Sequence, residues 1–297
     1  MTSNPATHDV EPHRRRLINV AYRLLGSVAD AEDAVQEAFI RWYALTPDDR
    51  DAIETPAAWL TTVTSRICLD QLGSARARRE RYVGQWLPEP VPDRTEWARA
   101  DAGADPADRI TLDESIDMAF LVVLDAMSPA ERVAFLLHDV FRYPFDEVAE
   151  IVGRTPAACR QLASTARRKV RDTRPVTTPA AGRAEVVREF KRAWEAMDIE
   201  ALLGILDPDV VAVADGGGRV AAALEPIEGP EIIASFMLAL ARRSDLRMEE
   251  HTVNGQPGLV IRQDDATLTV FAFDVAGGRI TRIWAVRNPD KLRQWND

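Results

Sequence analysis

Cysteine and histidine are scarce in this chain. Its 297 residues include only two cysteines, Cys68 and Cys159, and four scattered histidines. These numbers exclude a disulfide framework and give no metal-ligand spacing, so we expect no metal site and no other cofactor. No apolar run approaches the roughly 18 residues of a membrane span, and the N-terminus lacks the apolar stretch of a signal peptide. We therefore expect a cytoplasmic protein that does not contact a membrane.

Basic residues are also in the minority. The chain has 37 Lys+Arg against 47 Asp+Glu, a formal net charge of −10. Because non-specific affinity for DNA comes from neutralising phosphates, this charge argues against a DNA-coating protein and against a repressor that binds operators alone. The basic residues are nevertheless concentrated, with five arginines in 66–81 and seven basic residues in 154–174. Two such patches predict nucleic acid held at defined points.

Apolar periodicity in the first part of the chain predicts helices. They cover residues 14–80, with a break at Gly26, a second helix capped by Ser27 or Asp30, and a third that begins at Thr55 and Pro56. The periodicity fails from about residue 82 to 108, where prolines gather. The later signals are helices at 112–127 and 131–141, the second opened by a capping box at Ser128, and a second linker at 174–182.

Beyond residue 182 the pattern changes to helix followed by strands. We expect helices packed on a curved antiparallel sheet, an α+β arrangement. Asn288 and Pro289 then predict a short terminal helix, whose Leu292 and Trp295 are placed to pack on another domain. The expected elements are helices at 184–206, 230–242 and 289–295, and strands at 209–215, 246–253, 259–261, 267–275 and 279–287, the last two forming a hairpin.

The most specific local pattern is a helix-turn-helix at residues 145–171. A helix-turn-helix needs a small residue where its two helices cross, a glycine at the turn and apolar residues on the inner face of the second helix. Ala149, Gly153, Cys159 and Leu162 meet these needs. The opposite face of the second helix carries side chains that could contact base edges and phosphates. They are Arg160, Gln161, Ser164, Arg167, Arg168 and Arg171. The alternative is an ordinary amphipathic helix with a solvated basic face.

Four strings, in order and at this spacing, extend the pattern. They are ADAEDAVQEAF at 29–39, AWLTTVTSRICLD at 58–70, LDAMSPAER at 124–132 and FDEVAEIVG at 145–153. With them, residues 14–172 resemble the two helical regions of an extracytoplasmic-function (ECF) sigma factor, the promoter-recognition subunit of bacterial RNA polymerase. One departure is Gly73, which stands where arginine is expected and allows the helix to end early.

Three further motifs narrow the resemblance to the ECF41-like or SigJ-like subgroup, which carries a C-terminal SnoaL-like domain. They are WLPEP at 86–90, DGGGR at 215–219 and NPDKL at 288–292. The resemblance implies a multidomain protein of two all-α regions and an α+β, NTF2-like cone. The implied parts are sigma region 2 at 10–81, a linker at 82–108, sigma region 4 at 109–173, a linker at 174–182 and the SnoaL-like domain at 183–297.

The resemblance also implies a function and its residues. The chain would bind core RNA polymerase and direct promoter-specific initiation, with the SnoaL-like domain as a regulator in cis. The residues that would contact the β′ clamp helices of the polymerase are Asp30, Asp33, Gln36 and Glu37. Those that would contact the −10 element are Trp59, Arg66, Arg76, Arg78 and Arg79. The −35 element would be contacted by the basic face of the helix described above. Regulatory contacts would come from Trp86, Leu87, Pro88, Asp215, Gly216, Gly217, Gly218, Arg219, Asn288, Pro289, Asp290, Lys291 and Leu292.

Each role has a plainer alternative. Taken without the resemblance, the acidic strip is better explained as a solvated helix face, and Trp59 is more often a core residue in such a position. SnoaL-like folds include polyketide cyclases and ketosteroid-isomerase relatives, so Asp215, His251 and Trp284 could line an apolar pocket with an acid/base carboxylate. A turn in which the Asp215 carboxylate accepts backbone N–H bonds is favoured. The alternative function is a DNA-binding module coupled to a domain that binds or transforms a small apolar ligand.

Overall fold

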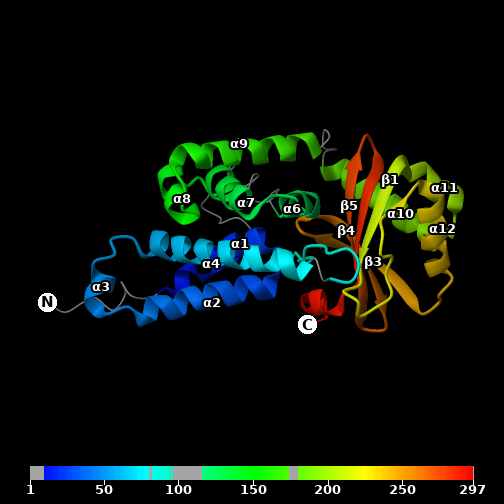
Figure 1. Ribbon diagram of the computed structural model, residues 1–297. Helices are drawn as coiled ribbons and strands as arrows, with labels where there is room; N and C mark the ends of the chain where they lie inside the picture. The colour runs from blue at the N-terminus through cyan, green and yellow to red at the C-terminus, as the bar shows by residue number, and fades with distance from the viewer. Residues whose placement is uncertain (1–9, 80–81, 94, 96–115, 174–179, 297) are drawn as a thin grey trace. The chain divides into compact units, whose positions relative to one another are not determined.

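The computed structural model describes residues 10–79, 82–93, 95, 116–173 and 180–296 (Figure 1). These residues fall into two compact units. The helical unit contains residues 10–78 and 124–170, and the sheet unit contains the remaining described residues, 82–93 and 116–123 among them. Residues 82–93, which we predicted to lie in a linker, therefore belong with the C-terminal sheet.

The first half of the helical unit consists of helices, and the three that the sequence predicts begin where it indicates. It comprises the 3-10 turn η2 (Glu11–His13), α1 (Arg14–Leu25), α2 (Val28–Ala44), α3 (Pro47–Asp51) and α4 (Pro56–Arg79). Gly26 ends α1 in a left-handed conformation, with φ at 71°. Of the two predicted caps, Ser27 is the one used, since its side chain accepts a hydrogen bond from the backbone N–H of Asp30. The sequence allowed this last helix to end early at Gly73. That expectation is wrong, because α4 continues to Arg79.

The second half contains the helix-turn-helix. It follows α6 (Met118–Asp125), most of which belongs to the sheet unit. It comprises α7 (Pro129–Phe135), the π-helix η4 (Leu136–Val140), α8 (Phe145–Val152) and α9 (Pro156–Thr173). The capping box at Ser128 is confirmed, because the Ser128 and Glu131 side chains each accept the other residue's backbone N–H. The predicted helix over 131–141 is α-helical only to Phe135 and then widens to the π form. Residues 112–115 of the predicted 112–127 helix lie outside the described residues.

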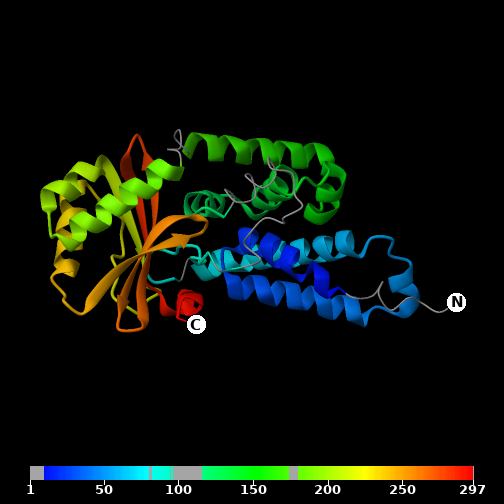
Figure 2. The same cartoon turned by 180° about the vertical axis from the view of Figure 1, so that it is seen from behind.

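The sheet unit carries six strands and three α-helices. The helices are α10 (Ala180–Glu195), α11 (Ile199–Ile205) and α12 (Pro230–Ala241), and Figures 1 and 2 show all three on one side of the sheet. The strand order is β2-β1-β6-β5-β4-β3. The strands are β1 (Leu206–Asp215), β2 (Ile227–Glu228), β3 (Leu246–Val253), β4 (Gln256–Gln263), β5 (Ala266–Ala276) and β6 (Arg279–Val286).

Three predictions for this unit are corrected. The single helix over 184–206 is wrong: Met197 takes a φ of 53°, and Asp198 caps α11 as a new helix. The sheet is antiparallel except between β1 and β6, which are parallel. The terminal helix at 289–295 is two 3-10 turns, η5 (Pro289–Lys291) and η6 (Arg293–Trp295), the first capped by Asn288 as expected.

Each face of the sheet covers its own apolar core. One core lies against the helices and includes Phe190, Trp194 and Met237. The other lies on the opposite face and joins Leu87 and Met118 to the sheet and to the two 3-10 turns, which contribute Leu292 and Trp295. Since side chains alternate along a strand, neighbouring residues of β1 serve different cores. The chain between the two predicted sigma regions thus contributes to the core of the C-terminal domain.

Two glycines of the helical unit have different backbone conformations, and substitution by alanine should therefore have opposite effects on stability. Gly153 turns the helix-turn-helix with φ at 68°, and Gly73 lies inside α4; a Cβ at either would meet no atom within 4 Å. Gly153→Ala should destabilise the fold by about 1–2 kcal/mol, the cost of a left-handed L-residue. Gly73→Ala should stabilise it by about 0.5–1 kcal/mol, because alanine loses less entropy in a helix. Urea unfolding followed by far-ultraviolet circular dichroism measures both, and equal effects would contradict the assignment.

Candidate functional site

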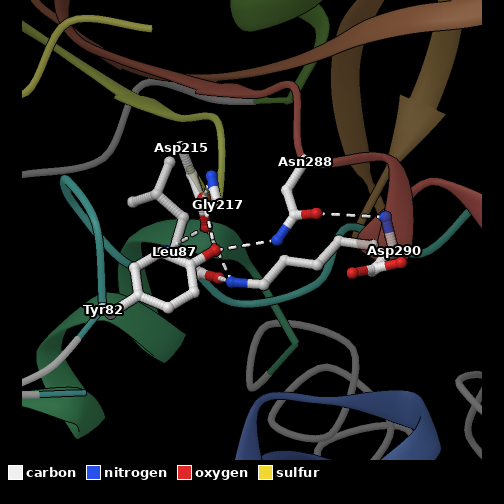
Figure 3. Close-up of polar contacts among 7 residues, drawn as sticks. Tyr82, Leu87, Asp215, Gly217, Asn288 and Asp290 are labelled. Atoms are coloured by element: carbon white, nitrogen blue, oxygen red, sulfur yellow. Dashed lines mark hydrogen bonds and ion pairs between the residues drawn. The ribbon is translucent and has the colours of Figure 1, made fainter. Parts of the chain in front are cut away.

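The carboxylate of Asp215 is the most constrained polar group in the sheet unit. Asp215 ends β1 and is 0% exposed. Its Oδ1 accepts hydrogen bonds from the Tyr82 hydroxyl at 2.6 Å and from the backbone N–H of Gly217 at 3.0 Å. Its Oδ2 accepts from the backbone N–H of Leu87 at 2.9 Å and from Lys291 Nζ at 2.7 Å (Figure 3). These bonds join the predicted motifs at 86–90, 215–219 and 288–292.

Lys291 is the cation that balances this carboxylate. Its ammonium also donates to the carbonyl oxygen of Leu87, and it lies 4.2 Å from the centre of the Trp86 ring. A cation over an aromatic face is attracted by the ring quadrupole, more so when desolvated. Lys291 is 8% exposed. The pair is therefore enclosed, and removing either charge would leave the other buried without its partner.

Gly217, the second residue after Asp215, is required by the close approach of Asn288. Gly217 has a φ of 62°, and a Cβ there would lie 2.3 Å from Asn288 Nδ2. Asn288 Nδ2 donates to the Tyr82 hydroxyl at 2.8 Å, and the Asp215 carbonyl oxygen accepts the backbone N–H groups of Arg287 and Asn288. Outside this layer, Arg219 pairs with Asp290 at 2.9 Å with both side chains largely exposed. We call Tyr82, Leu87, Asp215, Gly217, Asn288 and Lys291 the Asp215 cluster.

Tyr82 acts in this cluster as a neutral donor. Burial raises the pKa of its hydroxyl, and the hydrogen bond to the Asp215 carboxylate raises that pKa further. Proton loss would place a second negative charge beside Asp215. The hydroxyl thus donates to Asp215 while it accepts from Asn288, which fixes the direction of both hydrogen bonds.

A second set of bonds holds the rest of the segment. Asn254 is 0% exposed; its Oδ1 accepts from Val91 N at 3.1 Å, and its Nδ2 donates to the Ile116 carbonyl at 2.8 Å. The Trp295 indole donates to the Pro90 carbonyl at 2.9 Å. Sequence reasoning assigned no contact to Tyr82 or Asn254. Asn254-Gly255 is a typical hairpin turn, which predicts the β3–β4 connection but not this bonding.

The less favoured alternative, an apolar pocket lined by Asp215, His251 and Trp284, is not what the structure shows for these residues. Trp284 is 3% exposed and belongs to the apolar core that also contains Trp295. His251 meets the Trp295 ring edge-on at 5.8 Å. These residues surround packed side chains, and the Asp215 oxygens already accept four hydrogen bonds. The backbone N–H bonds to Asp215 agree with the turn predicted from the sequence.

The basic face of α9 is presented to solvent, as predicted. Arg160, Gln161, Ser164, Arg167, Arg168 and Arg171 are all exposed, and the inner face is buried at Cys159, Ala163 and Ala166. Arg160 stands over the Phe145 ring at 5.4 Å, which orients its guanidinium. Arg167 forms an ion pair with Asp139 at 2.7 Å.

The acidic strip lies on α2. Asp33 and Gln36 are exposed, whereas Asp30 and Glu37 are partly buried, and Glu37 pairs with Arg41 at 2.9 Å. On α4, Trp59 is partly buried and meets the fully buried Trp42 edge-on at 5.3 Å, as the core alternative predicted. Arg66 is exposed. The side chains of the other predicted −10 arginines, Arg76, Arg78 and Arg79, lie outside what the structure describes.

The two halves of the helical unit are bonded to each other. Arg132 donates to the Leu24 carbonyl at 2.9 Å and pairs with Asp125 at 3.0 Å, and its burial lowers its pKa to about 10. Arg66 Nη2 donates to the Glu150 carbonyl at 2.9 Å. The Tyr143 hydroxyl donates to Thr61 Oγ1 at 3.0 Å. Candidate DNA-contacting residues thus lie beside the interface between the halves.

Comparisons with known proteins agree with this arrangement. The family model for sigma-70 region 2 matches residues 10–78, and that for sigma-70 region 4 matches residues 117–170. The ECF RNA polymerase sigma factor SigJ of Mycobacterium tuberculosis is 39% identical, over 96% of this chain and 92% of its own. The chain belongs to the ECF sigma factors. A probable ECF sigma factor of the same species, SigI, is 35% identical over 97% of this chain and 95% of its own.

A solved structure extends the likeness of this ECF sigma factor to the whole fold. The crystal structure of M. tuberculosis SigJ matches with a TM-score of 0.73 and 38% identity, over 96% of this chain and 97% of that one. The α+β C-terminal domain expected from the sequence is confirmed. The chain accordingly binds RNA polymerase and directs promoter-specific initiation, which is a non-enzymatic role. Among the described residues, no helix is long and apolar enough to cross a membrane.

The buried pair in the Asp215 cluster makes a stability prediction. Asp215→Asn should lower the free energy of unfolding by about 3–5 kcal/mol, because it leaves the Lys291 charge enclosed and unpaired. Asp290→Asn, which removes a carboxylate from the exposed pair with Arg219, should cost less than about 1 kcal/mol. Denaturant unfolding of the full chain measures both.

A double variant separates the charge effect from simple loss of contacts. Adding Lys291→Met to Asp215→Asn removes both charges, so the loss should be smaller than the sum of the two single losses. Additive losses would contradict the pairing.

Proposed function

We propose that the C-terminal domain of this ECF sigma factor regulates initiation in cis by holding the chain between its two sigma regions. The observation that carries the proposal is the bonding of both ends of that chain to the sheet unit. Residues 82–92 are held by Asp215, Lys291 and Asn254, and Ile116 is held by Asn254. A change in the hydrogen bonds of the Asp215 cluster would therefore affect the chain that connects the two sigma regions.

In the structure the two halves of the helical unit are bonded to each other. We propose that holding the chain between the sigma regions favours this state. Arg66, a candidate for the −10 element, is bonded to Glu150 in the other half. The two promoter elements lie apart along the duplex, so reading both would require the halves to separate. A ligand or contact shifts such an equilibrium only through its differential affinity for the two states. DNA and polymerase favour the separated state, and a held linker would oppose it.

The site roles follow the same assignment. We assign core binding to Asp30, Asp33, Gln36 and Glu37, because an exposed acidic strip suits a basic partner that must bind quickly and be released. Base contacts are assigned to Arg160 and Gln161, and phosphate contacts to Ser164, Arg167, Arg168 and Arg171. Arg66, Arg76, Arg78 and Arg79 are assigned to the −10 element, with Trp59 in a packing role. The work would take place in the cytoplasm, with the polymerase.

Charge reversal on α2 tests core binding. At 100° per residue, Asp33 lies about 40° from Glu37 around the helix, near the middle of the strip. Asp33→Lys should weaken binding to core polymerase about tenfold, roughly 1.4 kcal/mol, because it sets like charges together. Asp48→Lys makes the same charge change at an exposed position of α3, outside the strip, and should have little effect. Anisotropy titration of the labelled protein with core polymerase measures both, and equal effects would remove the assignment.

Transcription with purified core polymerase tests regulation in cis. Asp215→Asn loosens the hold on residues 82–87 and should raise run-off transcription from the cognate promoter at least threefold at saturating core enzyme. Asp290→Asn should leave it unchanged. Core affinity is measured in parallel, because a change there would locate the effect elsewhere. Equal transcription from the wild type and Asp215→Asn would contradict the regulatory proposal.

A second candidate function is small-molecule binding by the SnoaL-like domain. It is favoured by a cavity on the helix-bearing face of the sheet, lined mostly by apolar side chains such as Phe236, Leu268 and Phe271. Among the described residues, its lining holds no carboxylate, histidine or tyrosine that could act as an acid or base. We therefore propose binding of a small apolar ligand there, rather than cyclase or isomerase chemistry.

A further inference from the structure

The cavity in the C-terminal domain lies between α12 and the sheet, on the face opposite the Asp215 carboxylate. The space inside it that can hold the centre of a water-sized sphere is about 50 Å³, and its mouth is open to solvent. Its walls are largely aliphatic and aromatic, with Leu240, Leu246, Ile261 and Phe271 among them. A small cavity with this lining, open on one side, suits the apolar body of a small ligand.

The charged groups of the wall are of one sign. Among the described residues, Arg243, just beyond α12, and Arg287, just beyond β6, line the cavity without any acidic side chain. Arg243 pairs with Asp245 at 2.8 Å on the exposed side. Arg287 is partly buried and donates to the Ala221 carbonyl, but it has no carboxylate partner in the described part of the chain. Burial, and then the positive charge of Arg243, lower the pKa of Arg287.

We propose that this cavity binds an amphipathic carboxylate, with its apolar body among the aliphatic side chains and its carboxylate on Arg287. The proposal deepens the ligand-binding function proposed above by naming the class of ligand. A guanidinium offers two parallel N–H donors to a carboxylate, and such pairs gain strength where water is excluded. A neutral ligand of the same shape would leave Arg287 without a counter-charge.

One loop that lines the cavity also contacts the segment between the sigma regions. Ala222 and Ala223 line the cavity and belong to the loop that follows the glycines after Asp215. In the same loop, the Leu224 carbonyl accepts a hydrogen bond from Gln85 Nε2 at 3.1 Å. A ligand that displaces Ala222 and Ala223 would therefore move the contact to Gln85, beside Trp86. Through this loop the bound carboxylate would alter the hold on residues 82–87, a step that rests on the proposed regulation in cis.

Calorimetric titration of the full chain tests the binding step. The probes are octanoate and 4-phenylbutyrate, each compared with its uncharged alcohol. At least one carboxylate should bind, at least tenfold more weakly to Arg287→Gln than to the wild type, and the alcohols should not distinguish the two proteins. Arg282→Gln, an exposed arginine of the same strand, should bind like the wild type. Ala285→Leu, which fills the cavity, should abolish binding.

Two results would overturn the site: no binding of either carboxylate, or equal binding by Arg287→Gln. Circular dichroism shows whether each variant is folded, and Arg287→Lys provides a second test that keeps the charge and should retain part of the affinity.

Transcription separates the two steps of the inference. The probe that binds should change run-off transcription by the wild type at least twofold and leave transcription by Ala285→Leu unchanged. If the probe binds without effect while Asp215→Asn alters transcription, the coupling through the loop is overturned. If Asp215→Asn also leaves transcription unchanged, the proposal of regulation in cis is contradicted, whereas the proposal of a ligand-binding site is not.

Discussion

A carboxylate removed from water must be surrounded by donors, and the Asp215 cluster meets this requirement with groups from three distant parts of the chain. Tyr82 and Leu87 come from the segment between the sigma regions, and Lys291 comes from the turn η5 that follows β6. Because each donor would be left unsatisfied without the carboxylate, the segment and the terminal turns stay on the sheet together. The C-terminal domain of this sigma factor is thus built around the chain it would control.

Much of the fold was predictable because it depends on residues close together in sequence. Ser128 and Glu131 cap their helix through bonds three residues apart, and Gly153 meets a local requirement for positive φ. The exposed and buried faces of α9 follow from helical periodicity alone. The turn at Asp215 was predicted on the same basis, from an aspartate followed by three glycines.

The partners of Asp215 were not predictable in this way. They depend on the parallel pairing of β1 with β6, which sets Asp215 beside Val286 across more than 70 residues of chain. Nothing in the residues near Tyr82 or Asn254 indicates which strand end they will meet. The same limit explains the pocket predicted at Asp215 and Trp284: a strand pattern shows that side chains alternate, but not which face the helices will cover. Only the resemblance to a family suggested that the three motifs belong together.

The last two residues of β1 link the proposed cavity to the Asp215 cluster. Ala214 lines the cavity, and Asp215, the next residue, points to the opposite face and meets the linker. Substitutions around the cavity could therefore adapt this domain to new ligands during evolution without altering the bonds of the carboxylate. Insertion of one residue in β1 would have the opposite result, because it would exchange the two faces and turn the aspartate toward the ligand. The length of this strand should thus tolerate less variation among related proteins than the composition of the cavity wall.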